Sequence, residues 1–158
     1  MKQWLTFIFS FLSFLAVALM IIFIVMGNKP YSDVEKQAIE RVESENLLAD
    51  VKQAYVYANK QTSVTVIGTN AEGKLSAVFV PSGEGDLKVV SLEGAVTAKQ
   101  ARETALADMD VEDVLYTKLG MESDGPVWEV AFTNNKDELN YVYILAGDGS
   151  KWKQILNL

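Results

Sequence analysis

The sequence contains no cysteine and no histidine. Without cysteine the chain has no disulfide framework, no thiolate nucleophile and no cysteine-ligated zinc site. Without histidine it lacks the side chain that most often serves as a general base near neutral pH. Catalysis by this chain would therefore have to rest on other groups, such as its carboxylates.

Basic residues are also scarce. The 14 Lys and Arg are outnumbered by 21 Asp and Glu. Beyond residue 27, 13 of those basic residues face all 21 acidic ones, a net charge of −8. Phosphate binding needs a basic surface, so this composition argues against nucleic acid as a partner. Anionic lipid headgroups would also repel this part of the chain.

One stretch of the chain carries no charge at all. Residues 4–26, WLTFIFSFLSFLAVALMIIFIVM, run for 23 positions without an Asp, Glu, Lys or Arg. As a helix this segment would reach roughly 34 Å, enough to cross a hydrocarbon core of about 30 Å. A buried core helix is the alternative, but nothing downstream is apolar enough to surround it. The segment predicts a membrane-spanning helix.

The apolar run is longer than that of a cleaved signal peptide, which is roughly 7–15 residues. Ala16 and Ala18 could form a cleavage site, but the apolar run continues to Met26, and no cysteine follows for a lipid anchor. We therefore predict an uncleaved signal anchor over residues 1–27. Lys and Arg differ little between its two sides, so the orientation rests mainly on its position. We expect a single-pass protein of the cell membrane, with its N-terminus cytoplasmic and its later residues outside.

The rest of the chain repeats one plan, a helix followed by strands. Ser32 and Glu35 form a capping-box pattern at the start of the first predicted helix, and Thr97 and Gln100 form one at the second, 65 residues later. Apolar residues then follow at helical spacing. They are Val34, Ala38, Ile39 and Val42 in the first helix, and Ala98, Ala101, Ala105, Leu106 and Met109 in the second.

Alternating, β-rich runs separated by turn residues follow each helix. The predicted strands are Ala54–Ala58, Ser63–Gly68, Leu75–Pro81 and Leu87–Leu92, then Val114–Leu119, Val127–Thr133, Leu139–Ala146 and Trp152–Leu156. The predicted turns are at 70–74, 134–137 and 147–150. Such short spacing indicates antiparallel hairpins with a helix on one face, an α+β fold. In the strand from Val127, the alternation places Trp128, Val130 and Phe132 in the core, and Val127, Glu129 and Ala131 on the other face.

Several of these runs together resemble a known family. TAKQARETAL from Thr97, PVWEVAF from Pro126 and YVYILAGDGS from Tyr141 look like a PepSY-type module. The earlier runs, AYVYAN from Ala54 and VTVIGTNAEGK from Val64, resemble the partner domain of the TseB-like (YpmB-like) proteins of Firmicutes.

The resemblance to TseB-like proteins implies two tandem cystatin-like α+β domains, at residues 28–94 and 95–158, on one transmembrane anchor. It also implies regulation of cell wall elongation through contact with a penicillin-binding transpeptidase. The family has no catalytic motif to transfer. One departure is that the PepSY strand that commonly ends in Asp reads YILAGD here, which places Asp148 in a turn.

One motif suggests a nucleotide site. Gly68 to Lys74 match G-x-x-x-x-G-K, but Leu75 stands where a phosphate loop needs Ser or Thr for magnesium. A strand is also predicted to follow, where a phosphate loop needs a helix. The motif therefore indicates a hairpin, and we expect no nucleotide.

Two further patterns suggest catalysis or metal binding. Ser150 to Lys153 match S-x-x-K, but residues three apart in a strand point to opposite faces, and S-D-N and K-T-G are absent. Four carboxylates lie within six residues, but a calcium loop starting at the first would need Gly where Asp113 stands and Glu where Leu119 stands. These four are Asp108, Asp110, Glu112 and Asp113. We predict no catalytic, cofactor-binding or metal-binding residues.

The tyrosines are the candidate partner-binding residues. Tyr55 and Tyr57 share one strand face, as do Tyr141 and Tyr143. If a helix covers one face of each sheet, a tyrosine row on the opposite face would suit a protein partner. Cross-strand packing or a seam between the two domains is the alternative, and the sequence favours it.

These observations favour a non-enzymatic, membrane-anchored envelope protein that binds a transpeptidase. The second hypothesis is inhibition or chaperoning of an envelope peptidase, with a peptide added to an exposed sheet edge. The third, and weakest, is wall hydrolysis by acidic residues.

Overall fold

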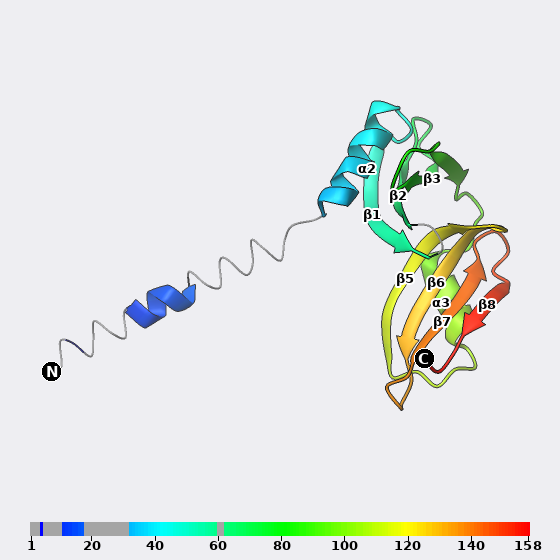
Figure 1. Ribbon diagram of the computed structural model, residues 1–158. Coiled ribbons are helices and arrows are strands. Elements are labelled where there is room, and N and C mark those ends of the chain that lie inside the picture. The colour runs from blue at the N-terminus through cyan, green and yellow to red at the C-terminus, as the bar shows by residue number, and fades with distance from the viewer. Residues whose placement is uncertain (1–3, 5–10, 18–31, 60–61) are drawn as a thin grey trace. The chain divides into compact units, whose positions relative to one another are not determined.

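The computed structural model describes residue 4 and residues 11–17, 32–59 and 62–158 (Figure 1). Met1–Ser32 and Asp33–Leu158 are separate compact units. In the first unit, residues 11–17 are helical. No helix among the described residues has the length and apolarity of a membrane span. The predicted anchor at residues 4–26 lies largely outside the described residues.

The second unit contains the predicted plan twice, a helix followed by four antiparallel strands. The first half consists of α2 (Asp33–Ser44), β1 (Asp50–Ala58), β2 (Thr62–Thr69), β3 (Leu75–Pro81) and β4 (Lys88–Ser91). The second half consists of α3 (Ala98–Leu106), β5 (Asp113–Glu122), β6 (Gly125–Thr133), β7 (Leu139–Leu145) and β8 (Lys151–Ile155). Each sheet has its strands in sequence order, β1-β2-β3-β4 and β5-β6-β7-β8. The α+β class is confirmed, and the two sheets are consistent with two tandem domains.

The helices begin where the capping patterns predict. At α3 the box is complete: Gln100 N donates to Thr97 Oγ1 at 3.3 Å, and Thr97 N donates to Gln100 Oε1 at 2.9 Å. These bonds satisfy two amides that the first turn of a helix leaves unpaired. In α2 the predicted apolar face is buried at Ala38 and Val42, whereas Val34 in the first turn is 50 % exposed. The buried face of α2 is therefore shorter than its periodicity suggests.

The β2–β3 connection is the predicted hairpin. The Asn70 side-chain oxygen accepts hydrogen bonds from the amides of Glu72 and Lys74, at 3.1 and 2.9 Å. Gly73 has φ +76°, a conformation that glycine adopts without steric cost. Because strand β3 begins directly after Lys74, this glycine-containing segment has the geometry of a turn and not of a phosphate loop.

The β6–β7 turn reproduces that geometry in the second half. The Asn134 side-chain oxygen accepts from the amides of Lys136 and Glu138, both at 3.0 Å. Asp137 takes the left-handed position, with φ +59°, where the first half has glycine. The two halves therefore repeat each other in detail at their turns, although their residues differ.

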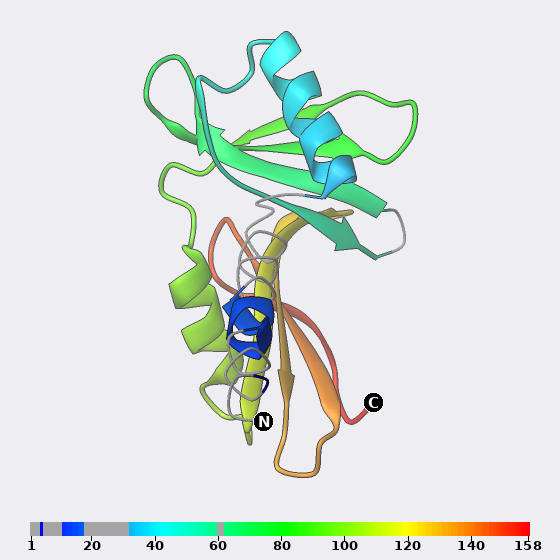
Figure 2. The same ribbon diagram turned by 90° about the vertical axis from the view of Figure 1, so that its left-hand side faces the viewer.

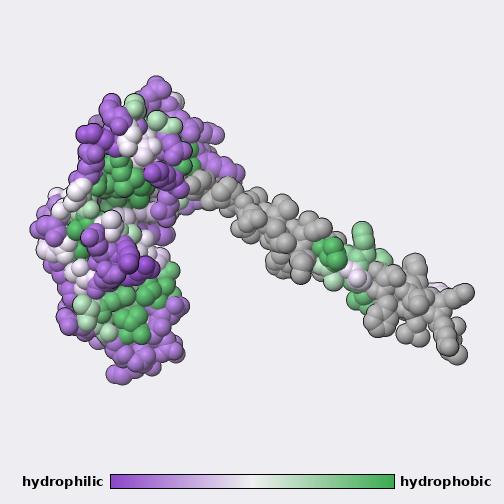
Figure 3. All heavy atoms as spheres, turned by 180° about the vertical axis from the view of Figure 1, so that it is seen from behind, coloured by the Kyte–Doolittle hydropathy of each residue, from purple (hydrophilic) through white to green (hydrophobic). Residues whose placement is uncertain are grey.

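Each helix covers one face of its own sheet. α2 packs on β1, β2 and β3, and α3 packs on β5, β6 and β7 (Figure 2). Under α2, a row of valines alternates along the strands and is fully buried or nearly so. These valines are Val64, Val66, Val78 and Val80. Hydrophilic side chains surround smaller apolar areas on the surface seen in Figure 3.

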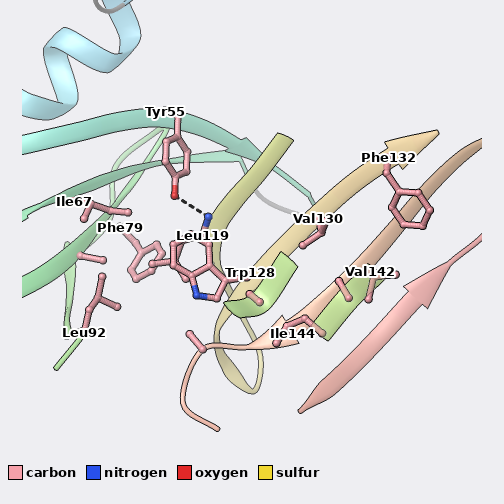
Figure 4. Close-up of a cluster of buried hydrophobic side chains, with 14 residues drawn as sticks. Tyr55, Ile67, Phe79, Leu92, Leu119, Trp128, Val130, Phe132, Val142 and Ile144 are labelled. Carbon is pink, nitrogen blue, oxygen red and sulfur yellow. Dashed lines mark hydrogen bonds between the residues drawn. The ribbon is translucent and has the colours of Figure 1, made fainter. Parts of the chain in front are cut away.

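One hydrophobic cluster joins the two halves. It contains Tyr55, Ile67, Ala77, Phe79 and Leu92 of the first half, and Ala101, Ala105, Leu119, Trp128, Val130, Phe132, Val142, Ile144 and Ala146 of the second. Figure 4 shows Phe79, Leu119 and Trp128 close together where the two sheets meet. The first sheet is thus covered on its second face by the other half of the chain.

Strand β6 is buried on both of its faces. Trp128, Val130 and Phe132 lie in the shared cluster, as predicted. Their neighbours, Val127, Glu129 and Ala131, are buried as well, at 0, 5 and 0 % exposure. The alternation correctly separates the two faces, but a second layer of side chains, described below, covers the face opposite α3.

Candidate functional site

The predicted tyrosines lie on the sheet faces opposite the two helices. Tyr55 and Tyr57 come from β1 and are buried. On β7, Tyr143 is buried and Tyr141 is partly exposed. Strand β5 lies between the two pairs. Tyr55 and Tyr57 form hydrogen bonds with its residues Leu119 and Glu122. Most of the predicted tyrosine surface is therefore internal, the alternative that the sequence favours, and a partner-binding role for these residues stays a prediction.

Tyr55 holds the backbone of β5. The Leu119 amide donates to the Tyr55 hydroxyl at 2.7 Å (Figure 4). Thr65 Oγ1 donates to the Leu119 carbonyl at 2.7 Å. All three residues are buried. The two side chains therefore satisfy both polar groups of a residue in the cluster, which would otherwise be costly to bury. Burial raises the pKa of Tyr55 to about 12, and the Leu119 amide opposes that rise.

The Tyr57 side chain reaches the face of the second sheet opposite α3. Its hydroxyl donates to Glu122 Oε1 at 2.8 Å, and Asn59 donates to the same carboxylate oxygen. Burial raises the pKa of Tyr57 above its ordinary value; the Asn59 bond lowers it, and Glu122 raises it further. The hydroxyl therefore stays protonated and keeps its role as a donor.

The Tyr57 ring lies against Gly120. A Cβ atom built on Gly120 would be 2.2 to 2.4 Å from three atoms of this ring, far inside van der Waals contact. Glycine is required here because the ring approaches the β5 backbone closely, and not because of a left-handed backbone conformation. Since Tyr57 is only 2 % exposed, the ring has little room to move away.

Glu129 is the centre of a polar network on the same face. Tyr116 donates to Glu129 Oε1 at 2.9 Å. The pKa of Tyr143 is raised mainly by burial, and further by the charge of Glu129 and a hydrogen bond to it. The pKa of Tyr116 is raised by the same causes. A carboxylate that is 5 % exposed is thus stabilised by tyrosine donors, as a buried charge requires.

Two lysines flank this network. Lys118 lies directly across from Glu129 in the β5–β6 register, and its ammonium donates to the Val56 carbonyl at 3.1 Å. The same ammonium lies 4.9 Å from the centre of the Tyr116 ring. Lys153 lies 5.6 Å from the Tyr143 ring centre. At these distances the aromatic faces stabilise the cations, so the site contains charges of both signs.

The arrangement provides donors, acceptors and aromatic surface. Tyrosines whose pKa values are raised remain protonated near neutral pH, where they donate hydrogen bonds and do not act as bases. Among the described residues, no group of three or more acidic side chains is placed to hold a metal ion. In the acidic run before β5, Asp110 instead accepts a hydrogen bond from Asn135. Hydrogen bonds and cation–ring contacts therefore make up this site.

The S-x-x-K pattern lies in the turn between β7 and β8 and at the start of β8. The amide and hydroxyl of Ser150 both donate to Asp148 Oδ1, at 2.9 and 2.7 Å. These bonds lower the pKa of the exposed Asp148 carboxyl. Ser150 therefore has a turn-forming role, and Lys153 instead lies beside Tyr143.

A family comparison supports the predicted resemblance. Residues 37–81 match the model of the cell wall elongation regulator TseB-like domain. Over these residues the chain is similar to a TseB-like domain. The match runs from α2 to the end of β3. We call the contacts of Tyr55, Tyr57 and Thr65 with β5 the junction between the halves. The matched residues therefore contain the first-half part of this junction.

A solved structure extends the likeness beyond the TseB-like domain. The YpmB protein from Bacillus subtilis superposes with a TM-score of 0.69 at 20 % sequence identity. The alignment covers 80 % of this chain and 99 % of that one. At this identity the likeness establishes the fold. No curated protein sequence matches the chain.

The sequence alone did not indicate which residues form hydrogen bonds with Tyr55 and Tyr57, or with the tyrosines of the second sheet. Glu129 could have been noticed, because it is the one charged residue in the apolar run PVWEVAF. A charge in a strand that is buried on both faces calls for a partner. Gly120 and Lys118 gave no such indication, because their roles depend on how the two sheets meet.

Proposed function

We propose that this protein is a membrane-anchored, non-enzymatic regulator of cell wall elongation that acts outside the membrane by binding a penicillin-binding transpeptidase. The observation that carries this proposal is the TseB-like regulator domain at residues 37–81. The site geometry supports it, because the hydroxyls of Tyr55, Tyr57 and Tyr116 are engaged in hydrogen bonds that hold the strands together. Tethering near the membrane would raise the effective concentration of the domains against a co-anchored enzyme.

The contact surface in this proposal is the face of the second sheet opposite α3. Tyr141 and Tyr116 are partly exposed there, beside the lysines of the Glu129 network. Aromatic side chains next to charged groups are common at the centres of protein interfaces. Tyr55 and Tyr57 would then act indirectly, by holding this sheet against the first one.

Photo-cross-linking in cells tests the proposal. A photoreactive residue at position 141 is expected to capture a membrane transpeptidase. The matched control is position 99, an exposed lysine on α3, which covers the other face of the same sheet. Capture of no wall-synthesis enzyme from position 141, or equal capture from both positions, would contradict the proposed surface.

A second candidate function is inhibition or chaperoning of an envelope peptidase. The observation in its favour is β4, a strand of four residues that pairs with β3, forms an edge of the sheet among the described residues and carries Val89 at 49 % exposure. An extended peptide could add to this edge by main-chain hydrogen bonds. Deleting the gene should then increase envelope proteolysis, whereas the first proposal expects altered cell shape or length.

A further inference from the structure

A cleft of about 720 Å³ opens between the two halves of the second unit. The first half contributes the residue after β1, the start of β2, the end of β3, the loop before β4 and the first residue of β4. The second half contributes the end of β5, the β5–β6 turn and β8. Its volume lies in the range of about 300–1,000 Å³ that is typical of small-molecule sites. Glu122 belongs both to the cleft and to the junction, through its bonds with Tyr57 and Asn59.

The lining combines aromatic surface with many short polar groups. Phe79, Met121 and Trp152 supply apolar contact, and four serine or threonine hydroxyls lie around them. The indole of Trp152 is fixed by a hydrogen bond from its Nε1 to Asp124 and by a T-shaped contact with Tyr143, with ring centres 6.1 Å apart. A preoriented aromatic side chain lowers the entropy cost of binding a ligand.

The charges of the lining almost cancel. Glu84, Asp86 and Glu122 are opposed by Lys88 and Lys153. A polyphosphate would face the carboxylates and a polycation would face the lysines, so neither gains a clear electrostatic advantage. A neutral ligand rich in hydroxyls suits the lining better. Its hydroxyls could donate to the carboxylates and accept from the lysines, while its carbon–hydrogen faces pack on the indole.

We propose that this cleft binds a short neutral glycan, held between Trp152 of β8 and the polar loop that precedes β4. This site adjoins the transpeptidase contact proposed above and shares Lys153 with it, but its lining does not include Tyr116 or Tyr141. The choice of N-acetylated sugars as the probe rests on the proposed function, because wall strands carry them. A ligand in the cleft would contact both halves and so would stabilise the contact between them.

Titration of the full-length, isotope-labelled protein in detergent micelles with a tetramer of N-acetylglucosamine tests this inference. The expected result is a saturable shift of the Trp152 indole N–H signal in the nuclear magnetic resonance spectrum. The Trp128 indole is an internal control, because its Nε1 donates to the Val96 carbonyl at 2.7 Å within the core. Equal shifts of both signals, or no saturation, would overturn the proposal.

Variants localise the binding. Trp152→Ala should weaken the affinity by roughly tenfold or more, the loss expected for an aromatic anchor. Asp86→Ala, in an exposed loop, tests the polar side without touching a strand, and it should weaken binding severalfold. Lys136→Ala, in the distant β6–β7 turn, is the matched surface control and should bind like the unmodified protein. Unchanged affinity in both cleft variants would refute the site.

The titration and the cellular cross-linking can fail separately. Loss of glycan binding in Trp152→Ala with full cross-linking at position 141 would support two independent surfaces. A chain that binds no glycan but still captures a transpeptidase would refute the cleft and retain the proposed function. A short peptide with one amine and two carboxylates is the competing probe, and a stronger response to it than to the glycan would also refute the inference.

Discussion

The two halves of the second unit share one plan but differ in what covers their sheets. The first sheet lies between α2 and the second half, so both of its faces are buried in apolar contacts. The second sheet has α3 on one face, and its other face is covered by its own tyrosines around Glu129 and, at Gly120, by Tyr57 of the first half. The face opposite α3 thus carries polar groups that bond to each other, whereas the enclosed face of the first sheet is mostly apolar, with Tyr55 and Thr65 bonding to the β5 backbone. Both halves therefore have the same order of helix and strands, and the side chains on each sheet face differ according to what packs against that face.

The largest expected effect comes from breaking the contact between the halves. Gly120→Ala would place a methyl group 2.2 to 2.4 Å from the Tyr57 ring. Overpacking of this kind costs about 1–3 kcal/mol and occasionally more, and here it also breaks the bond to Glu122, so we expect a loss of about 3 kcal/mol in the free energy of unfolding. Urea denaturation followed by tryptophan fluorescence measures it.

Gly147→Ala is the matched control for this substitution. Gly147 has no atom within 4 Å of an added Cβ, and its backbone is not left-handed. We expect a change within about 0.5 kcal/mol. Similar effects of the two substitutions would show that the Tyr57 contact does not hold the halves together.

The second effect is a loss of stability in alkali through Tyr55. Its pKa is raised from 10.0 to about 12 in the folded protein. Its ionisation is therefore suppressed by folding, so its contribution is fully present below about pH 10 and is lost as the pH rises to about 12. The size is about 2–3 kcal/mol by linkage.

Tyr55→Phe separates this effect from the other tyrosines. Loss of the hydroxyl leaves the Leu119 amide without its acceptor and should cost about 1–3 kcal/mol at neutral pH. The remaining fall in stability between pH 10 and pH 12 should then be smaller than in the unmodified protein. An unchanged pH profile would mean that Tyr55 does not report on the junction.

Glu129→Gln tests the polar face of the second sheet. Glutamine keeps the shape but removes the negative charge that the tyrosines stabilise, and we expect a loss of about 1.5 kcal/mol. Thr65→Val is the comparison on the enclosed face of the first sheet. It removes the donor to the Leu119 carbonyl, and it should cost about 1 kcal/mol. An equal or smaller loss for Glu129→Gln would contradict the contrast between the two faces.

The smallest expected effect comes from the β2–β3 and β6–β7 turns, whose hydrogen bonds the two halves share. Asn70→Ala and Asn134→Ala each remove an oxygen that accepts two turn amides. Each should cost about 1 kcal/mol, like the loss of a helix cap. Because the bond lengths match, we expect the two losses to agree within about 0.5 kcal/mol. Thermal denaturation measures both losses. A clear difference between them would mean that the halves share the path of the backbone but not the energetics of their turns.

Local patterns predicted the elements well. Strand β3 has the predicted bounds, and Thr97 and Gln100 form the predicted capping box. These features depend on residues a few positions apart, so their sequence context contains the necessary information. The order of parts also indicated the TseB-like resemblance, which residues 37–81 confirm. The membrane anchor at residues 4–26 stays a prediction.

The candidate site could be predicted only in part. The sequence selected the tyrosines through their period-2 spacing, and it left open whether they face a partner or a seam. The structure places Tyr55 and Tyr57 at the junction between the halves, but it leaves Tyr141 partly exposed. Glu129, Lys118 and Gly120 acquire their roles from residues on other strands, so no local pattern could identify those roles.

The sequence by itself determined the helices, the strands, the turns and which residues share a face of each sheet. Those properties follow from backbone preferences and from the periods of the helix and the strand. Only the tertiary structure decided which faces are enclosed, because that depends on contacts such as Tyr55 with Leu119, 64 residues apart in the chain. Burial of the first sheet against the second half therefore placed Tyr55 and Tyr57 in the contact between the halves, whereas Tyr116 and Tyr143 surround Glu129 on the face opposite α3.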